Sequence, residues 1–304
     1  MSELRRQDYG RRGIHLLGLG VLKWRTRDSE RPVGTVRAAL DEFVGSKSFN
    51  NARFNNHPEL QRVAAGQAVL GAGSQGAAVE ALQNALQDMA FVMPSGVDGI
   101  YGREVTQAVK NFQAAAGLKQ TGSLNAETLK ALNRHAPPPG KKAWDAGASM
   151  ALVPDPGIGR GLQARVVVGV GQHRAFVFDA NGKLQKIYGV RTGRADHPDG
   201  RGEDTQPGVK VVDGKNRDPR AISSALWPES KGTAFGTRLF NLSDYDVKTG
   251  RTYVGDFGGQ ELHGTYDQHS IGRDASHGCI GLNNSDIEEF FDQIKNGEFV
   301  KIVR

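Results

Sequence analysis

Along the stretch from residue 66 to residue 134, apolar side chains recur every three or four positions, which is the period of an amphipathic helix. Three segments carry this pattern, at 79–89, 105–112 and 125–132, and a glycine-rich turn at 97–102 separates the first from the second. We therefore expect a small bundle of three short helices. The apolar positions are Val79, Leu82, Leu86 and Met89; Val105, Ala108, Val109 and Phe112; and Ala126, Leu129 and Leu132.

After residue 162 the apolar pattern changes to the shorter period of strands, with many β-branched and aromatic residues. One later segment returns to helical spacing, from Ser285, a capping residue, through Phe291 and Ile294, and Asn296-Gly297 ends it. We therefore expect an α+β multidomain protein, in which a small three-helix bundle is followed by a mostly β domain. The expected strands are 165–170, 174–178, 186–190, 209–212, 239–242 and 299–303.

A segment rich in proline and glycine lies between these halves, and its consecutive prolines favour an extended, semi-rigid spacer. We expect a helical domain at 66–134, a linker at 135–161 and a second domain at 162–304. Residues 1–65 are basic at the start, then polar and rich in asparagine, and they carry no motif to which a role could be assigned.

Length and composition describe an ordinary globular protein of about two domains, with 304 residues, 38% hydrophobic and 24% charged. A single cysteine excludes an intramolecular disulfide, so the fold depends on its own core. The net charge of +6 suggests an anionic partner or surroundings. We find no base-reading motif and expect no nucleic acid, whereas a polyanionic cell wall, or simply a solvated surface, fits the charge.

Membrane and export signals are weak. No run approaches the roughly 18 apolar residues that a membrane span requires, so we expect none. Residues 5–22 vaguely resemble the basic and apolar regions of a signal peptide. The apolar run is short, contains His15, and leads into Lys23-Trp24-Arg25 instead of a small-residue cleavage site. We therefore expect no signal peptide and leave the export route open.

The candidate chemistry centres on Cys279, which follows His277 by two residues and His263 by a longer interval. A thiol is a nucleophile only as the thiolate, and a nearby imidazole is the usual means of producing one. In a strand-like segment, His277 and Cys279 face the same side. A lone cysteine is often just a small buried apolar residue. The two histidines favour a cysteine nucleophile instead.

Acyl transfer also requires N–H donors for the oxyanion of the tetrahedral intermediate. Gly264 and Gly278, each directly after a histidine, give the backbone the close access that such donors need. Two histidines and one cysteine can also bind zinc. However, a carboxylate or a second cysteine at compact spacing is missing. We therefore expect an acyl-transfer site with neither a metal nor another cofactor.

The helical stretch closely resembles the peptidoglycan-binding domain that many bacterial cell-wall enzymes share. The resemblance implies a surface that holds glycan or stem peptide, with Asp98, Gly99 and Tyr101 as candidate contacts, although such modules also serve as spacers. The residues that carry it are G-S-Q-G-A-A-V-E-A-L-Q-N-A-L (73–86), V-D-G-I-Y-G (97–102), A-V-K-N-F-Q (108–113) and G-L-K-Q-T-G (117–122).

Residues from about 165 to 304 resemble the catalytic domain of the L,D-transpeptidases, the YkuD-type enzymes of the bacterial cell wall. The most specific pieces are H-G-T (263–265) and S-H-G-C-I (276–280). The resemblance covers nearly the whole C-terminal half. The other pieces are V-V-V-G-V with its hairpin, V-R-T-G (190–193), T-Q-P-G (205–208) and A-F-G-T-R-L-F (234–240).

This resemblance implies a role for each residue of the motif. Cys279 is the expected nucleophile and His263 the expected base. The carbonyl of Gly264 would orient His263. His277 and the backbone amides around Gly278 and Cys279 would stabilise the oxyanion.

Around this centre, we expect Ser276 to support the turn, and Thr265, Arg273, Gly278 and Gly281 to border the substrate. One departure stands out. The family usually has arginine or asparagine two residues after the cysteine, where this chain has Gly281.

The implied reaction is attack of Cys279 on the bond before the terminal D-alanine of a peptidoglycan stem, through a thioester. An amine acceptor gives a 3→3 cross-link, a D-amino acid gives exchange, and water gives L,D-carboxypeptidase trimming. A catalytically degenerate wall-binding protein is the alternative that Gly281 favours. The expected site of action is the bacterial cell envelope. A secretion or injection apparatus, with residues 1–65 as a loading segment, would make the protein an exported effector.

Overall fold

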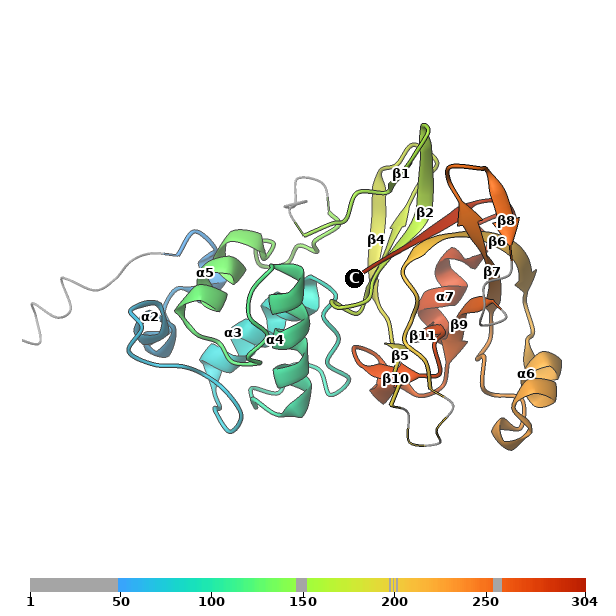
Figure 1. The fold of residues 1–304 in the computed structure, drawn as a ribbon. Helices are drawn as coiled ribbons and strands as arrows, with labels where there is room; N and C mark the ends of the chain where they lie inside the picture. Colours follow the sequence, from blue (N-terminus) through green and yellow to red (C-terminus); the bar gives the residue numbers. More distant parts are fainter. Residues whose placement is uncertain (1–48, 146–151, 197, 199, 201, 254–258) are drawn as a thin grey trace, which may run out of the picture. The chain divides into compact units, whose positions relative to one another are not determined.

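The computed structural model describes residues 49–304 apart from 146–151, 197, 199, 201 and 254–258 (Figure 1). The signal-like segment, residues 1–48 of the predicted N-terminal segment 1–65, and part of the predicted linker lie outside them. Within the described part of the chain, no helix has both the length and the apolar character that crossing a membrane requires.

The three expected helices are present as α3, α4 and α5, and two shorter helical segments precede them. Asn125 caps α5, because its side chain accepts a hydrogen bond from the backbone N–H of Thr128. Local periodicity was enough to predict these three helices. The helical segments are η1 (Ala52–Phe54), α2 (Pro58–Ala64), α3 (Ala77–Asp88), α4 (Arg103–Ala115) and α5 (Ala126–His135).

The helical core begins before residue 66. Phe54, Leu60 and Val63 are fully buried and belong to the same apolar cluster as the inner faces of α3, α4 and α5. On the other side, the N–H of Ala143 donates to the carbonyl oxygen of Asp88 at 2.9 Å. The start of the proline-rich segment therefore packs against the end of α3 instead of running free as a spacer.

The glycine-rich turn before α4 is held from inside. The side chain of Gln83 donates to Asp98 Oδ1 at 2.7 Å and accepts from the N–H of Gly99 at 2.8 Å. Gly99 is buried, and Tyr101 is 1% exposed with its hydroxyl donating to the carbonyl of Gly122. Burial raises the pKa of Tyr101. Of the three residues predicted as wall contacts, Gly99 and Tyr101 therefore lie in the core, and only Asp98 is exposed.

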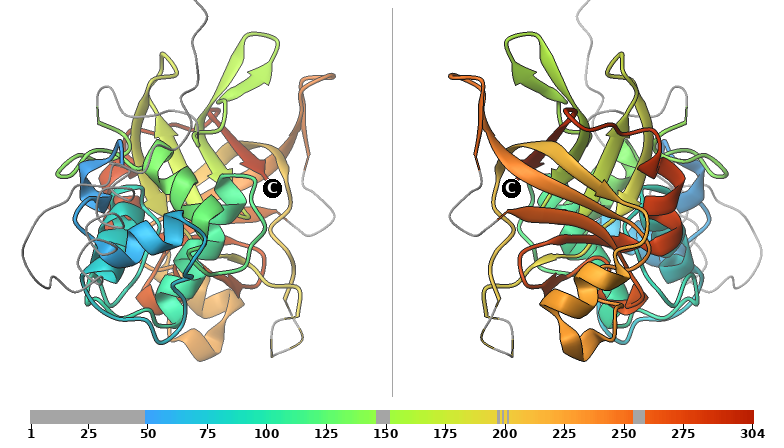
Figure 2. Two further views of the ribbon diagram at one scale, coloured as in Figure 1. Left: turned by 90° about the vertical axis from the view of Figure 1, so that its left-hand side faces the viewer. Right: turned by 90° about the vertical axis from the view of Figure 1, so that its right-hand side faces the viewer.

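The second half is a curled, mostly antiparallel sheet in the order β11-β9-β7-β6-β12-β2-β3-β4 (Figure 2). Two neighbouring pairs, β11 with β9 and β12 with β2, are parallel. The fold class is the expected α+β arrangement. Strand bounds are β1 (Gly157–Gly159), β2 (Leu162–Gly169), β3 (Arg174–Phe178), β4 (Leu184–Gly189), β5 (Thr192–Gly193), β6 (Gly208–Asn216), β7 (Leu239–Asp246), β8 (Arg251–Tyr253), β9 (Gln260–Thr265), β10 (Asp274–Ser276), β11 (Ile280–Asn283) and β12 (Phe299–Val303).

The helix α7 (Asn284–Phe291) follows β11 directly and anchors the end of the sheet that carries β9 and β11 (Figure 2). Its buried face is Ile287, Phe290 and Phe291, and the ring of Phe290 stacks on Phe240 of β7 at 6.1 Å. The predicted helix is present, but its N-cap is Asn283 instead of Ser285, and it ends at Phe291, before the predicted end at Asn296-Gly297. The other short helical segments are α6 (Arg220–Leu226), η2 (Pro228–Ser230) and η3 (Gln268–Ser270).

Candidate active site

The parallel pair β9 and β11 brings the two sequence motifs together. Its register sets Leu262 opposite Ile280 and His263 opposite Gly281. Because side chains alternate between the faces of a strand, positions 261 and 263 share one face with positions 279 and 281. Cys279 therefore stands beside Glu261 and diagonally from His263, on the same side of the sheet.

His263 is 2% exposed and has a defined tautomer. Its Nδ1 lies 2.7 Å from the carbonyl oxygen of Gly264, which can only accept, so Nδ1 carries the proton and Nε2 is left as the acceptor. Burial, and secondarily the charge of Arg191, lower the pKa of His263 to about 3. The ring of Phe235 meets it edge-on at 5.1 Å. This is a neutral imidazole in the form that a general base needs.

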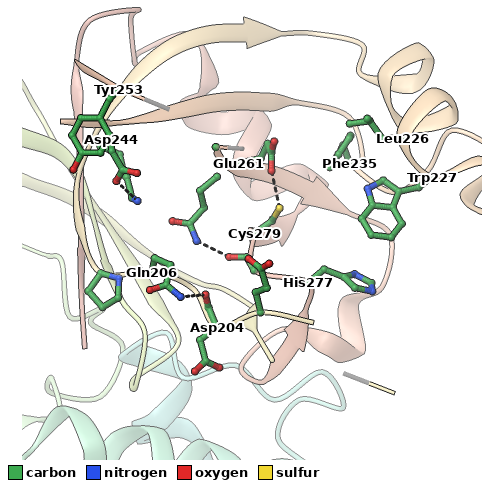
Figure 3. A pocket seen from close by; sticks show the side chains of 16 residues that line it. Asp204, Gln206, Leu226, Trp227, Phe235, Asp244, Tyr253, Glu261, His277 and Cys279 are labelled. Carbon is green, nitrogen blue, oxygen red and sulfur yellow. Dashed lines mark hydrogen bonds and ion pairs between the residues drawn. The ribbon is translucent and has the colours of Figure 1, made fainter. Parts of the chain in front are cut away.

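The thiol of Cys279 has an acidic neighbour that the sequence analysis missed. Its Sγ donates to Glu261 Oε2 at 2.8 Å (Figure 3). Burial and the Glu261 carboxylate raise the pKa of this thiol, whereas the positive charge of Arg191 lowers it. Burial also raises the pKa of Glu261 itself. Strand alternation was the available signal, since Glu261 stands two residues before His263.

The turn that presents Cys279 is fixed by hydrogen bonds to its backbone. Gly278 has a φ of +122°, and its carbonyl accepts from Gln260 Nε2 at 2.7 Å and from Thr205 Oγ1 at 2.9 Å. Ser276 Oγ donates to the carbonyl of Cys279 at 2.5 Å and accepts from the N–H of Gly278 at 3.3 Å. Hydrogen bonds thus hold the turn at Gly278 and at Cys279 itself.

The V-R-T-G segment lies against this turn through the short parallel pair β5 and β10. A Cβ at Gly193 would come within 2.6 Å of both Gly278 Cα and the backbone N of Thr205, and closer still to the carbonyl oxygen of Glu203. These are backbone atoms that cannot move aside, so only glycine fits. Next to it, Thr192 donates to Asp274 Oδ1 at 2.6 Å, which holds the strand that leads into Ser276.

Two cavities meet at Cys279, and His277, Trp227 and Phe235 line both. Figure 3 shows the larger one. The larger, about 520 Å³, has acidic residues on its wall. The smaller, about 270 Å³, contains His263. The indole of Trp227 lies over the ring of His277 at 4.7 Å. The acids of the larger cavity are Glu203, Asp204, Asp244 and Glu261, of which Asp244 is paired with Lys210.

Not every predicted site residue joins this arrangement. Thr265 is buried, and its hydroxyl accepts from the N–H of Asp267 at 3.1 Å. Arg273 lines neither cavity at Cys279, and the structure uses its carbonyl, which accepts from the N–H of Thr192. Gly281 lines neither cavity, because the side chain of Arg191 covers it. The side chains that line the two cavities at Cys279 therefore come from other residues.

The remaining predicted residues do come together. Cys279, His277 and Gly278 line the larger cavity, and His263 and Ser276 line the smaller. Gly264 contributes its carbonyl to His263. Among the described residues, no group of three or more His, Cys, Asp or Glu side chains is arranged to hold a metal ion. The chemistry available from this arrangement is that of a thiol and an imidazole base beside a cavity.

Comparison with curated proteins finds one partial relative. N-acetylmuramoyl-L-alanine amidase CwlL of Bacillus licheniformis is 33% identical over 99 residues, which is 32% of this chain. The match spans only 27% of the amidase.

Solved structures similar to the chain include two L,D-transpeptidases. The one from Xylanimonas cellulosilytica DSM 15894 (residues 123–326) is 20% identical, with 77% of this chain and 96% of that chain covered and a TM-score of 0.40. The one from Stackebrandtia nassauensis is 19% identical, with 77% and 94% covered and a TM-score of 0.34.

Two family models match the sequence itself. The model described as a putative peptidoglycan binding domain matches residues 75–132, over α3, α4 and most of α5. The model described as the L,D-transpeptidase catalytic domain matches residues 163–302, over the sheet and α7. Residues 163–302 therefore belong to the L,D-transpeptidase catalytic domain family, and residues 75–132 to the peptidoglycan-binding domain family.

Proposed function

We propose that the protein is a cysteine acyltransferase that acts on peptidoglycan stem peptides through a thioester on Cys279. The observation that carries the proposal is the β9–β11 register, since it sets the thiol diagonally from a neutral His263 whose Nε2 is free to accept a proton. The open cavities on either side of Cys279 support a substrate that approaches as an extended peptide.

In the proposed first half-reaction, the Cys279 thiol turns from Glu261 and gives its proton to Nε2 of His263. The thiolate attacks the carbonyl that joins the third stem residue to D-alanine, and N–H groups of the turn with His277 stabilise the oxyanion. His263 then returns the proton to the amine of D-alanine as the C–N bond breaks. A thioester and free D-alanine result.

The second half-reaction depends on the acceptor, and the charge of the larger cavity favours an amine. Glu203, Asp204 and Glu261 line it, so an acceptor that carries an ammonium group is attracted there. His263 takes a proton from the amine as it attacks the thioester. A new amide forms and the thiol is restored. The product is a 3→3 cross-link with a stem amine or an exchanged stem with a D-amino acid.

The helical domain supports a place of action on the cell wall. Its family is described as peptidoglycan-binding, and the curated relative is named as an amidase of N-acetylmuramoyl-L-alanine. We propose that this domain holds the protein on peptidoglycan in the bacterial cell envelope, with Asp98 as the remaining candidate contact in the turn before α4.

The test is mass spectrometry of purified muropeptides incubated with the protein. We expect loss of D-alanine from tetrapeptide stems together with 3→3 dimers, and no change with Cys279→Ala. Trimmed tripeptides without dimers would identify the protein as an L,D-carboxypeptidase and refute the amine acceptor. Unchanged muropeptides with the wild-type chain, which still sediments with sacculi, would identify a wall-binding protein and refute the enzyme.

A further inference from the structure

Arg191 and Gly281, far apart in the sequence, face each other across an antiparallel bridge. The N–H of Arg191 donates to the carbonyl of Gly281 at 2.8 Å, and the N–H of Gly281 donates back at 3.1 Å. This bridge joins the V-R-T-G segment to β11, two residues beyond the cysteine.

The absence of a side chain at residue 281 is what admits the arginine. A Cβ at Gly281 would lie 2.8 Å from Cγ and 3.0 Å from Cδ of Arg191, and closer still to its Nε. Gly281 does not have a positive φ, so its backbone conformation does not itself demand glycine. Glycine is required because the Arg191 side chain passes so close to residue 281. Any larger residue at 281 would push that side chain away.

Arg191, whose side chain crosses Gly281, lines the smaller cavity together with Cys279 and His263. Its Nε is buried and has no hydrogen-bond partner among the described residues, while Nη1 is 3.5 Å from Ser270 Oγ. Because so few N–H groups of this guanidinium have an acceptor, hydrogen bonding does not explain its position. Its position beside the nucleophile gives it an electrostatic effect instead.

The charged groups around the Cys279 thiol have opposite effects on its ionisation. Glu261 is hydrogen-bonded to Cys279 and disfavours a second negative charge, and Asp213 lies near enough to Glu261 to act on it electrostatically. The other titratable neighbours are His263, which is neutral, and His277, whose ring lies tilted against Trp227. Arg191 favours the thiolate, with Asp267 acting on it from the loop after β9.

We propose that Arg191 is a positioning residue which holds a positive charge against the Cys279–His263 pair, and that residue 281 is glycine to let it do so. The departure at Gly281 is then no sign of a degenerate site, because the cation beside the nucleophile comes from the V-R-T-G segment. The proposal rests on the proposed function only in taking Cys279 as the nucleophile.

The test follows the rate of Cys279 alkylation by iodoacetamide against pH, which involves no peptidoglycan. Arg191→Gln keeps a long polar side chain without the charge. We therefore expect the midpoint of the pH dependence of alkylation to rise by about one pH unit. Arg191→Lys should stay near the wild-type midpoint. Arg194→Met, which removes a half-exposed arginine directly after this segment, is the matched control and should not move the midpoint.

Gly281→Ala separates charge from structure, since it leaves every charged residue in place. We expect it to raise the midpoint in the wild-type background and to add nothing when combined with Arg191→Gln. Thermal unfolding identifies any variant that fails to fold. A midpoint in Arg191→Gln equal to that of wild type, or a Gly281→Ala shift that persists without the arginine, would overturn the proposal. Both results are independent of whether Cys279 acts on stem peptides.

Discussion

The thiol of Cys279 donates its hydrogen bond to the carboxylate of Glu261, 2.8 Å away on the neighbouring strand, while the imidazole of His263 stands diagonally from it on the same face. A carboxylate in that position stabilises the thiol and opposes the thiolate. The resting nucleophile is therefore protonated, and its activation requires a turn of the Cys279 side chain from an acid towards a base.

Glu261→Gln should make the thiol more acidic. The substitution removes a negative charge next to Sγ and keeps a side chain of the same size. We expect the midpoint of Cys279 alkylation to fall by about one pH unit relative to wild type. Glu203→Gln, on the wall of the same cavity, is the control and should change it far less. A midpoint that rises in Glu261→Gln would contradict this account of the thiol.

Protein stability should fall in acid partly through His263. Its folded pKa of about 3 is below the ordinary value of 6.5, so the unfolded chain binds this proton first. The stabilisation is complete above pH 6.5 and is lost as pH falls towards 3. Each pH unit in that window costs about 1.4 kcal/mol of unfolding free energy from this one group.

Urea unfolding at several pH values measures this slope. His263→Gln should show a shallower dependence than wild type between pH 6.5 and 3, whatever its absolute stability. His269→Gln, which replaces an exposed histidine, should keep the wild-type slope. Equal slopes for all three proteins would show that His263 is not held neutral by burial.

Gly193→Ala should damage both fold and activity. The added methyl meets the backbone of Gly278, Thr205 and Glu203, and none of these can rotate away. We expect a loss of about 1–3 kcal/mol of unfolding free energy and at least a tenfold loss of activity. Gly71→Ala, whose nearest new contact is the Ser123 hydroxyl at 3.4 Å, should be nearly neutral in both assays. Retention of full activity by Gly193→Ala would mean that the turn tolerates displacement.

Thr205→Val tests whether the brace on the Gly278 carbonyl matters for the reaction. The variant has almost the same shape but loses two hydrogen bonds, one from the N–H of Gly193 and one to Gly278. We expect about 1–3 kcal/mol less stability and a lower kcat. Thr205→Ser keeps the hydroxyl and should recover most of the kcat. If Val and Ser variants have the same kcat, the hydroxyl does not position the turn.

Local patterns in the sequence were sufficient for much of the fold and for the centre of the site. Helical spacing predicted α3, α4, α5 and α7, and the motif residues Cys279 and His263, which the resemblance singled out, lie on one sheet face. Strands β9 and β11 were missed, because they are short and interrupted by glycine, so they lack the alternation of half-buried strands.

The contacts that tune the site were harder to foresee, because they depend on pairing between distant segments. Arg191 meets Gly281 only once the V-R-T-G segment is bridged to β11. Conversely, Thr265 and Arg273 are close to the motif in sequence, yet neither lines a cavity at Cys279. Tyr101, a candidate wall contact by resemblance, is a core residue.

The most direct test of the central claim is the intact mass of the protein, quenched in acid during turnover of a tetrapeptide stem. The account predicts an adduct equal to the stem without its D-alanine, mapped by peptide digestion to Cys279 and released by hydroxylamine as expected of a thioester. The Cys279→Ala variant should carry none. Turnover of the stem without any adduct on Cys279, or with Cys279→Ala still active, would contradict it.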